Sequence, residues 1–201
     1  KSFSDSRIRI FDQKNMGVSA ARNVGLINMT GQYLCFLDAD DVMPKNSIKS
    51  RMNIFHQYPD ISFIDGIVIY MNDDMTPTGK KYIPSFNGYP YDELLQLNRS
   101  CYFGNTWMIK WEKYFNYRFS EKMTHAEDLL FYLNISKGRK YSFTKNPVLY
   151  YRRRNNSAMN DLTGLEQGYI DLFEKIKHEL RPDITTLKTL KKRIMRIMFF
   201  I

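Results

Sequence analysis

The pattern of apolar and polar positions predicts an α/β protein. Residues 33–37 and 61–71 are apolar runs without alternation, as in strands that are buried on both faces of a parallel sheet. Residues 18–29 carry apolar side chains at helical spacing, and Pro44 is expected to open a helix that runs to about residue 58. With a short alternating strand at 7–11, the order is β-α-β-α-β, which predicts a sheet with crossover helices.

The later segments mix short strands with longer helices. We expect residues 1–160 to form one α/β domain and residues 161–201 a basic helical extension. Only one short strand precedes the first helix, so we also expect an N-terminal portion of the domain to be missing from this sequence. The remaining predicted elements are a hairpin or loop at 72–90, a short helix at 91–97, an aromatic strand or turn at 102–111, a helix at 124–137, strands at 141–144 and 148–152, and helices at 161–180 and from 182 onward.

Three carboxylates follow the first apolar run directly. Asp38, Asp40 and Asp41 lie within four residues, although like charges repel and their desolvation is costly. Ligands of open α/β sheets bind at the carboxyl ends of strands, and one or two carboxylates with a substrate phosphate are a usual Mg²⁺ site. The cluster therefore predicts a metal-phosphate site. The alternative for Asp41 is that it caps the following helix.

Charge and cysteine content narrow the function only partly. The formal net charge is +9, and residues 181–201 alone hold six Lys or Arg against one Asp. A basic chain binds nucleic acid, anionic lipid or phosphorylated small molecules, and charge does not choose among them. Two distant cysteines, Cys35 and Cys101, predict neither a disulfide framework nor a metal site, and they favour a reducing cytoplasmic setting.

The last predicted helix has helically spaced apolar residues and a basic opposite face. One interpretation is a peripheral contact with anionic lipid at the inner face of the cell membrane. The equally weighted alternative is packing on the domain or on a second copy of the chain, as a homodimer. No stretch is long and apolar enough to predict a membrane span.

The first predicted helix and the turn before it form a second candidate site. Arg22 lies at the edge of its apolar stripe, where a guanidinium suits a diphosphate group, and Gly17 allows close approach of a ligand to the backbone. The alternative is an ordinary amphipathic helix with a salt-bridged Arg.

Two acids open the predicted helix at 124–137. Thr124 and Glu127 have the spacing of a capping box, and Asp128 in the first turn complements the helix dipole, so both acids have a purely structural explanation. The competing hypothesis is that one of them faces a substrate as a general base. The residues alone do not decide between these.

Basic and aromatic residues give two weaker signals. Arg152 to Arg154 are three consecutive cations that suit a diphosphate, although a solvated basic loop is the commoner explanation of such a run. Trp107 and its aromatic neighbours lie between the acidic segments, where an acceptor sugar stacks or where a core forms.

Taken in order, these segments resemble the family 2 glycosyltransferases, which are inverting enzymes of the GT-A fold. The resemblance covers about residues 5–160, and the family's upstream nucleotide-binding segment is not found here. It rests on four matches: N-x-G-V-S-A-A-R-N at 15–23, F-L-D-A-D-D at 36–41, H-A-E-D at 125–128 and Y-Y-R-R-R-N-N-S at 150–157. The first two motifs together are the more specific ones.

The resemblance implies a fold and a set of residue roles. The fold would be a Rossmann-like mixed, mainly parallel sheet flanked by helices, with further helices at the C-terminal end. Asp128 would be the general base, Asp40 would bind Mn²⁺ or Mg²⁺, and Glu127 and Trp107 would contact the acceptor. The residues implied for donor binding are Asn15, Gly17, Arg22, Asp38 and Asp40, and those for the diphosphate are Arg152, Arg154 and Ser157.

The implied reaction moves a sugar from a nucleotide-diphosphate sugar to a hydroxyl of a glycan or lipid-linked acceptor, in cell-surface polysaccharide or glycan synthesis. One alternative is a nucleotidyltransferase with a similar core, which would use two metal ions and release pyrophosphate. Another is a non-catalytic glycan- or nucleic-acid-binding module. Nucleic acid is not the expected partner, because the aromatic residues lack an interleaved stacking pattern.

Overall fold

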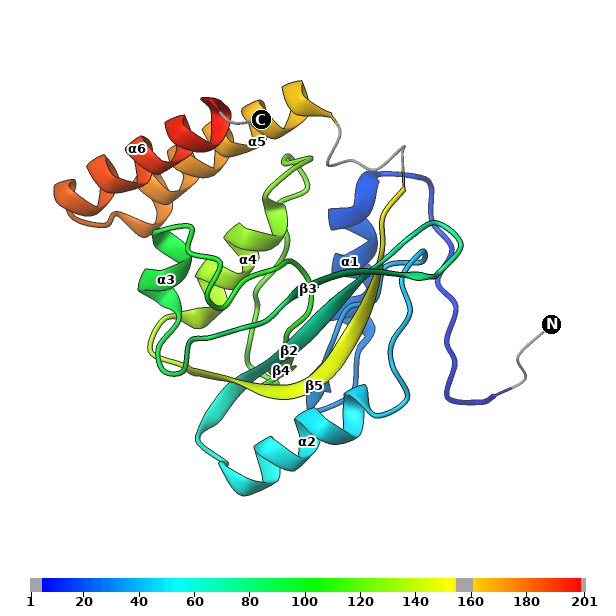
Figure 1. Cartoon of the computed structure of the whole chain (residues 1–201). Coiled ribbons are helices and arrows are strands. Elements are labelled where there is room, and N and C mark those ends of the chain that lie inside the picture. Colours follow the sequence, from blue (N-terminus) through cyan, green and yellow to red (C-terminus); the bar gives the residue numbers. More distant parts are fainter. Residues whose placement is uncertain (1–4, 155–160, 200–201) are drawn as a thin grey trace.

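The computed structural model describes residues 5–154 and 161–199. A five-stranded mixed sheet forms its centre, with strand order β1-β4-β2-β3 and with β5 paired to β2 (Figure 1). The strands are β1 (Tyr33–Leu34), β2 (Ile61–Met71), β3 (Pro77–Tyr82), β4 (Met108–Lys110) and β5 (Lys140–Arg152). The helices are α1 (Gly17–Asn28), α2 (Ser47–Gln57), α3 (Tyr91–Leu95), α4 (Glu127–Ser136), α5 (Leu162–Lys175), the π-helical turn η2 (Ile176–Leu180) and α6 (Ile184–Phe199).

The strand directions confirm a mixed sheet, in which β1, β2 and β5 run in one direction. β5 pairs with β2 in parallel, whereas β3 and β4 are antiparallel to β2. β1 is antiparallel to β4 and therefore runs in the same direction as β2 and β5. The crossover helix α2 accordingly joins two strands of one direction, with β4 inserted between them.

Four predicted strands differ from the structure. Residues 7–11 form no strand, and the run at 33–37 is reduced to the two residues of β1. Within the described residues β1 pairs only with β4, at the edge of the sheet, so its side chains are half-buried and not covered on both faces. The two strands predicted at 141–152 are one strand, β5, whose register against β2 shifts near Pro147.

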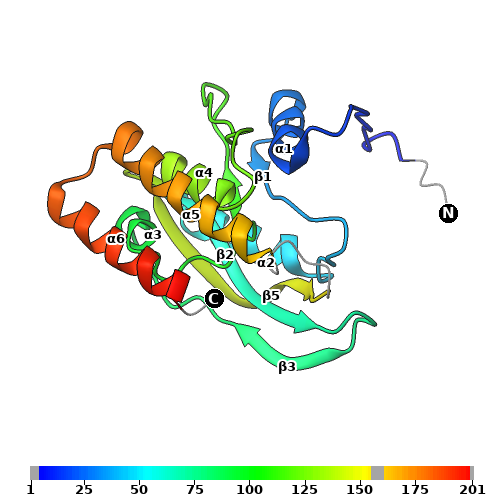
Figure 2. The ribbon, with the colours of Figure 1, turned by 90° about the horizontal axis from the view of Figure 1, so that it is seen from above.

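Helices cover the sheet in layers (Figures 1 and 2). α2 lies against one face, where Phe55 packs with Ile64 and Met108. α3 and α4 cover the other face, and α5 and α6 lie outside them. No helix among residues 5–154 and 161–199 is long and apolar enough to cross a membrane.

The C-terminal helices share the main core with the α/β part. A single cluster joins Trp107 and Phe131 to Leu172 of α5 and to Leu190 and Ile194 of α6. The predicted helical extension therefore packs onto the sheet-bearing part through its own apolar stripe, which is the packing alternative left open by the sequence.

α5 contacts the turn before α4 through two glycines. A Cβ at Gly168 would lie 2.5 Å from His125 Cβ and 2.9 Å from the His125 carbonyl oxygen, and a Cβ at Gly164 would lie 2.5 Å from His125 Cε1. Asp161 caps the helix here, since its Oδ1 accepts from the Gly164 amide at 3.0 Å. This close approach seats the segment that enters α4 directly on α5.

A buried polar group lies at the centre of β2. Asp65 is fully buried, and Tyr141 donates to its Oδ2 at 3.2 Å. Burial raises the pKa of Asp65 to about 6, against hydrogen bonds and the charge of Arg51, which lower it. Arg51 is also buried and donates to the carbonyl oxygens of Ser47 and Thr106 at 3.2 and 3.0 Å.

Gly168→Ala should destabilise the protein by about 1–3 kcal/mol, because the added methyl group meets backbone atoms of His125 that cannot swing away. Gly25→Ala is the matched control: Gly25 lies in the exposed part of α1 with nothing within 4 Å of an added Cβ. That change should stabilise by about 0.5–1 kcal/mol. Urea unfolding of both variants measures the difference. Equal effects of the two substitutions would contradict the close contact between α5 and His125.

Asp65→Asn should make the stability less dependent on pH. The folded protein binds a proton on Asp65 more tightly than the unfolded chain does, so the free energy of unfolding falls as the pH rises from about 4 through 6. The Asn variant avoids this loss and should be the more stable form at pH 7.5, by a few kcal/mol at most, but not at pH 4. Unfolding curves at the two pH values provide the measurement.

Asp60→Asn is the control for this prediction, because a hydrogen bond from Lys140 lowers the pKa of Asp60. Its substitution should reduce stability near neutral pH, which is the opposite sign. A stability difference between wild type and Asp65→Asn that is the same at pH 4 and pH 7.5 would be evidence against a raised pKa of Asp65.

Candidate functional site

The acidic turn that follows β1 is anchored to the end of β5. The Asp41 amide donates to the Asp38 carbonyl at 3.1 Å, and Val42 and Tyr150 exchange two backbone hydrogen bonds of 3.1 and 2.9 Å. Asp41 Oδ1 also accepts from the Arg152 amide at 2.9 Å. The structure thus brings together two motifs that are more than 100 residues apart in the sequence.

Asp41 is the structural member of the acidic cluster. Burial raises its pKa to about 6, the hydrogen bond from the Arg152 amide lowers it, and the charges of Asp40 and Asp38 raise it again. Asp41 joins the turn to β5 and does not cap α2, which has no side-chain cap hydrogen bond. Asp38 and Asp40 keep about half of their side-chain surface exposed.

Two of the three residues predicted to bind diphosphate lie near this turn. The Arg154 Nε is 3.7 Å from Asp40 Oδ2 and 3.8 Å from Asp73 Oδ1. Arg152 contributes its backbone amide to Asp41, and its side-chain Nε lies 3.0 Å from the Met75 sulfur. Ser157 lies outside the described residues.

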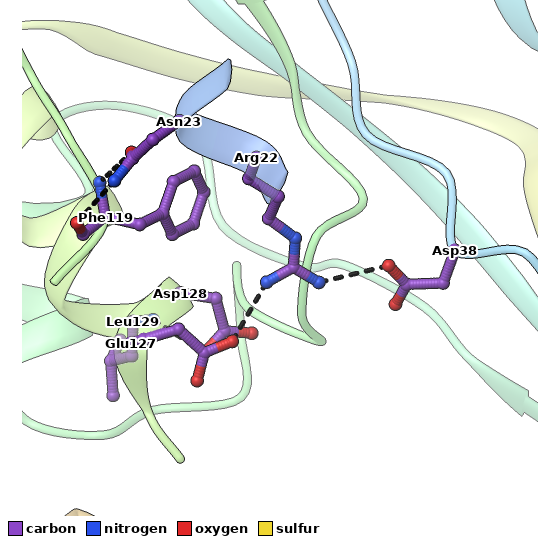
Figure 3. A network of polar contacts seen from close by, with 7 residues as sticks. All are labelled: Arg22, Asn23, Asp38, Phe119, Glu127, Asp128 and Leu129. Atoms are coloured by element: carbon purple, nitrogen blue, oxygen red, sulfur yellow. Dashed lines mark hydrogen bonds and ion pairs between the residues drawn. The ribbon is translucent and has the colours of Figure 1, made fainter. Parts of the chain in front are cut away.

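Arg22 connects the acidic turn to α4 (Figure 3). Its Nη2 is 3.0 Å from Asp38 Oδ1, and its Nη1 is 2.9 Å from Glu127 Oε1. Asn105, with its amide oxygen facing the guanidinium, accepts from the same two nitrogens at 2.9 and 3.0 Å. The guanidinium therefore binds three protein acceptors that come from three separate segments.

The surroundings of Arg22 are those of a buried cation. Only 10% of its side chain is exposed, and the guanidinium carbon lies 5.4 Å from the centre of the Phe119 ring. Burial lowers the pKa of Arg22, but the charges of Asp38, Glu127 and Asp128 outweigh this and raise it. Arg22 thus stays charged and positions acids on both sides of the site.

Asn23, the next residue of α1, fixes the loop on the other side of Arg22. Its Nδ2 donates to the Phe119 carbonyl at 3.0 Å, and its Oδ1 accepts from the Phe119 amide at 2.8 Å (Figure 3). Both Asn23 and Asn105 went unassigned in the sequence analysis. The position of Asn23 directly after Arg22 in a matched motif was a usable signal, whereas Asn105 had none.

The capping box expected at the start of α4 does not form. The helix begins at Glu127, its N-cap Ala126 has φ +57°, and no side chain caps it. Glu127 is buried and bound to Arg22; burial and Asp128 raise its pKa, and Arg22 lowers it. The structural explanation offered by the sequence for Glu127 is therefore replaced by an ion pair.

Asp128 is half-buried and lies beside Glu127 at the first turn of α4 (Figure 3). Its Oδ1 accepts from the Leu129 amide at 2.8 Å. A Cβ at Gly104 would lie 3.9 Å from its Oδ2, so the residue next to this oxygen has no side chain. Burial and the charge of Asp128 raise the pKa of Tyr102 well above its usual value, so the Tyr102 hydroxyl keeps its proton.

Two further predicted residues lie at the start of α1, and a third lies in the core. Asn15 Oδ1 accepts from the Gly17 amide at 3.1 Å, and Gly17 has φ +87°, a conformation that favours glycine. Trp107 is fully buried, donates to the Cys101 carbonyl at 2.8 Å and packs on Tyr132. We therefore withdraw the assignment of Trp107 to acceptor binding, because no part of it reaches the surface.

The described residues contain no group of three or more His, Cys, Asp or Glu that converges on one point as a metal site. The donor set that remains is the half-exposed carboxylate of Asp40, with Asp38 nearby in the turn. Mg²⁺ and Mn²⁺ accept such a set when substrate phosphate oxygens and water complete the coordination. The residues therefore fit a metal ion that is bound together with a phosphorylated ligand.

Comparison with known proteins identifies relatives over most of the chain. The minor teichoic acid biosynthesis protein GgaB of Bacillus subtilis is 29% identical over 151 residues, which are 73% of this chain and 16% of that protein. The UDP-Glc:alpha-D-GlcNAc-diphosphoundecaprenol beta-1,3-glucosyltransferase WfgD of Escherichia coli is 29% identical over 141 residues, 70% of this chain and 53% of that protein. The chain thus spans about half or less of the length of these relatives.

A solved structure shares the fold. The crystal structure of S. aureus TarS 1–349 in complex with UDP-GlcNAc aligns with a TM-score of 0.62 over 94% of this chain and 55% of that chain, at 15% sequence identity. The family described as Glycosyl transferase family 2 matches residues 1–152, three quarters of the sequence, which confirms the resemblance carried by the four motifs. The chain belongs to glycosyl transferase family 2.

Proposed function

We propose that this chain carries the catalytic site of an inverting, metal-dependent glycosyltransferase that takes its sugar from a nucleotide-diphosphate sugar. One observation carries the proposal. Arg22 holds the acidic turn through Asp38 and the first turn of α4 through Glu127, so a donor-side carboxylate cluster and the half-buried Asp128 border one site. Family membership supports the reaction class.

Similarity supports the nature of the substrates. TarS was crystallised with UDP-GlcNAc, and the name of WfgD gives it a UDP-glucose donor and a diphosphoundecaprenol-linked acceptor. By analogy the donor here is a nucleotide-diphosphate sugar and the acceptor a glycan or lipid-linked hydroxyl. The similarity to GgaB supports a setting in cell-surface polymer synthesis of the teichoic acid or polysaccharide kind.

Asp40 would hold a Mn²⁺ or Mg²⁺ ion together with the donor diphosphate. Its exposed carboxylate fits that role, and Asp41, fixed to the Arg152 amide, supports the turn that presents it. When bound, such a cation supplies Lewis-acid stabilisation of the departing diphosphate. Arg154, whose Nε lies 3.7 Å from Asp40 Oδ2, adds positive charge on the same side.

Asp128 would act as the general base. It takes the proton of the acceptor hydroxyl, whose oxygen bonds to the anomeric carbon while the bond from that carbon to the diphosphate oxygen breaks. The electron pair leaves with the diphosphate, and a single displacement inverts the configuration. The Leu129 amide donates to Oδ1 of this carboxylate, and Gly104 leaves room beside Oδ2. General-base catalysis of this kind contributes roughly 10²–10⁴-fold.

Asp128→Asn should reduce transfer by about 10²–10⁴-fold while donor binding is retained, because an amide cannot take the proton. The measurement is release of nucleoside diphosphate with acceptor present, together with donor affinity. Asp92→Asn is the matched control, since Asp92 is likewise an acid in the first turn of a helix. Equal activity of the two variants would exclude Asp128 as the base, and release of pyrophosphate by the wild type would point to nucleotidyl transfer.

Asp40→Asn should abolish the metal-dependent part of donor binding and leave the fold intact, because the half-exposed carboxylate contributes charge to the ligand and little to packing. Thermal shift with UDP, GDP and CDP and their common sugars, with and without Mn²⁺, tests this. Asp73→Asn is the control, as Asp73 lies at a similar distance from Arg154 but outside the turn. Unchanged metal-dependent stabilisation in Asp40→Asn would refute the metal assignment.

A further inference from the structure

α6 has an inward face that is fully used. Leu190 and Ile194 are buried in the main core, and Leu187 and Met198 pack against it. Arg193 donates to the Gln96 carbonyl and to the Asn98 side chain. The orientation of the helix about its axis is therefore set by the protein, and its other face points outward (Figure 2).

The outward face combines cations with exposed apolar side chains. Ile184, Met195 and Phe199 are 68%, 48% and 82% exposed. The same face carries four exposed cations, Lys188, Lys191, Lys192 and Arg196. Within the described residues none of these four has a carboxylate at ion-pair distance, and the sequence from 184 to 199 contains no acid.

Among the C-terminal helices, the excess of positive charge is confined to α6. The preceding helical segment, residues 162–180, carries four acids, Glu166, Asp171, Glu174 and Glu179, against two lysines. Lys175 and Lys177 are paired with Glu179 and Glu174 within that segment. The C-terminal helices therefore present a one-sided basic surface, whereas a helix pair that is merely solvated would mix both signs.

We propose that the outward face of α6 docks on an anionic lipid bilayer. Its lysines lie where they meet lipid phosphates, and Ile184, Met195 and Phe199 lie where they enter the boundary between headgroups and acyl chains. A second copy of this face would bring like charges together. A nucleic acid would leave the exposed apolar side chains unused.

The fold connects this surface to the candidate site. α5 lies beside α6 in Figure 2, and its Gly164 and Gly168 seat His125, two and three residues before Glu127 and Asp128. A bilayer under α6 would thus hold the site at a set distance from the lipid surface. This last step rests on the proposed function, whereas bilayer docking itself does not.

The test is co-sedimentation of the chain with vesicles of phosphatidylcholine alone or with one third phosphatidylglycerol. Wild type should bind only the anionic vesicles, and less tightly as salt is raised. The variant Lys188→Gln, Lys191→Gln, Lys192→Gln should bind about 100-fold more weakly. The control variant Lys49→Gln, Lys81→Gln, Lys145→Gln removes the same charge from exposed positions elsewhere and should bind within about threefold of wild type.

The apolar contribution is tested separately with Ile184→Ser and Met195→Ser together, which should weaken binding to anionic vesicles at high salt, where charge is screened. Failure of wild type to bind anionic vesicles, or equal losses in the two lysine variants, would overturn the proposal. A concentration-dependent dimer by sedimentation that the α6 substitutions abolish, without vesicle binding, would assign the face to a second copy instead. Thermal unfolding of each variant verifies that the fold is retained.

Discussion

The site depends on one buried cation. Arg22 is held between Asp38 of the acidic turn and Glu127 of α4, and Asn105 completes its acceptors. A buried charge is costly unless it is paired, so removal of the buried partner Glu127 leaves a penalty of about 3–5 kcal/mol. Removal of the half-exposed Asp38 costs less, because water screens that pair. The guanidinium therefore makes the positions of three segments interdependent. It also fixes the position of Asp38 while about half of that side chain stays exposed.

This arrangement divides the work between two neighbouring acids. Glu127 is buried and forms an ion pair with Arg22. Asp128, one residue further along α4, has an oxygen that faces Gly104. Successive residues of a helix point about 100° apart, which is why one acid can be structural and the other available. α5 supports the same turn from behind, since its glycines allow the backbone of His125 to approach.

Three predictions from the sequence were wrong because the environment of the residue in the folded protein, and not the local sequence pattern, decides its burial and its partner. The run at 33–37 was expected to be buried on both faces, but β1 lies at an edge of the described sheet. Trp107 was placed at an acceptor and is a core residue. The spacing of Thr124 and Glu127 suits a capping box, yet an ion pair with a residue 105 positions away competes successfully for Glu127. Each error concerns a contact that is remote in the sequence.

The sequence by itself determined the elements and the family. Local periodicity specifies helices and strands because their side-chain patterns repeat within a few residues, and the four motifs were enough to identify glycosyl transferase family 2. The tertiary structure alone decided that Asp41 bonds to Arg152, that Arg22 bridges Asp38 and Glu127, and which face of α6 stays open. Such pairings depend on how distant segments pack in three dimensions, and no local pattern encodes them.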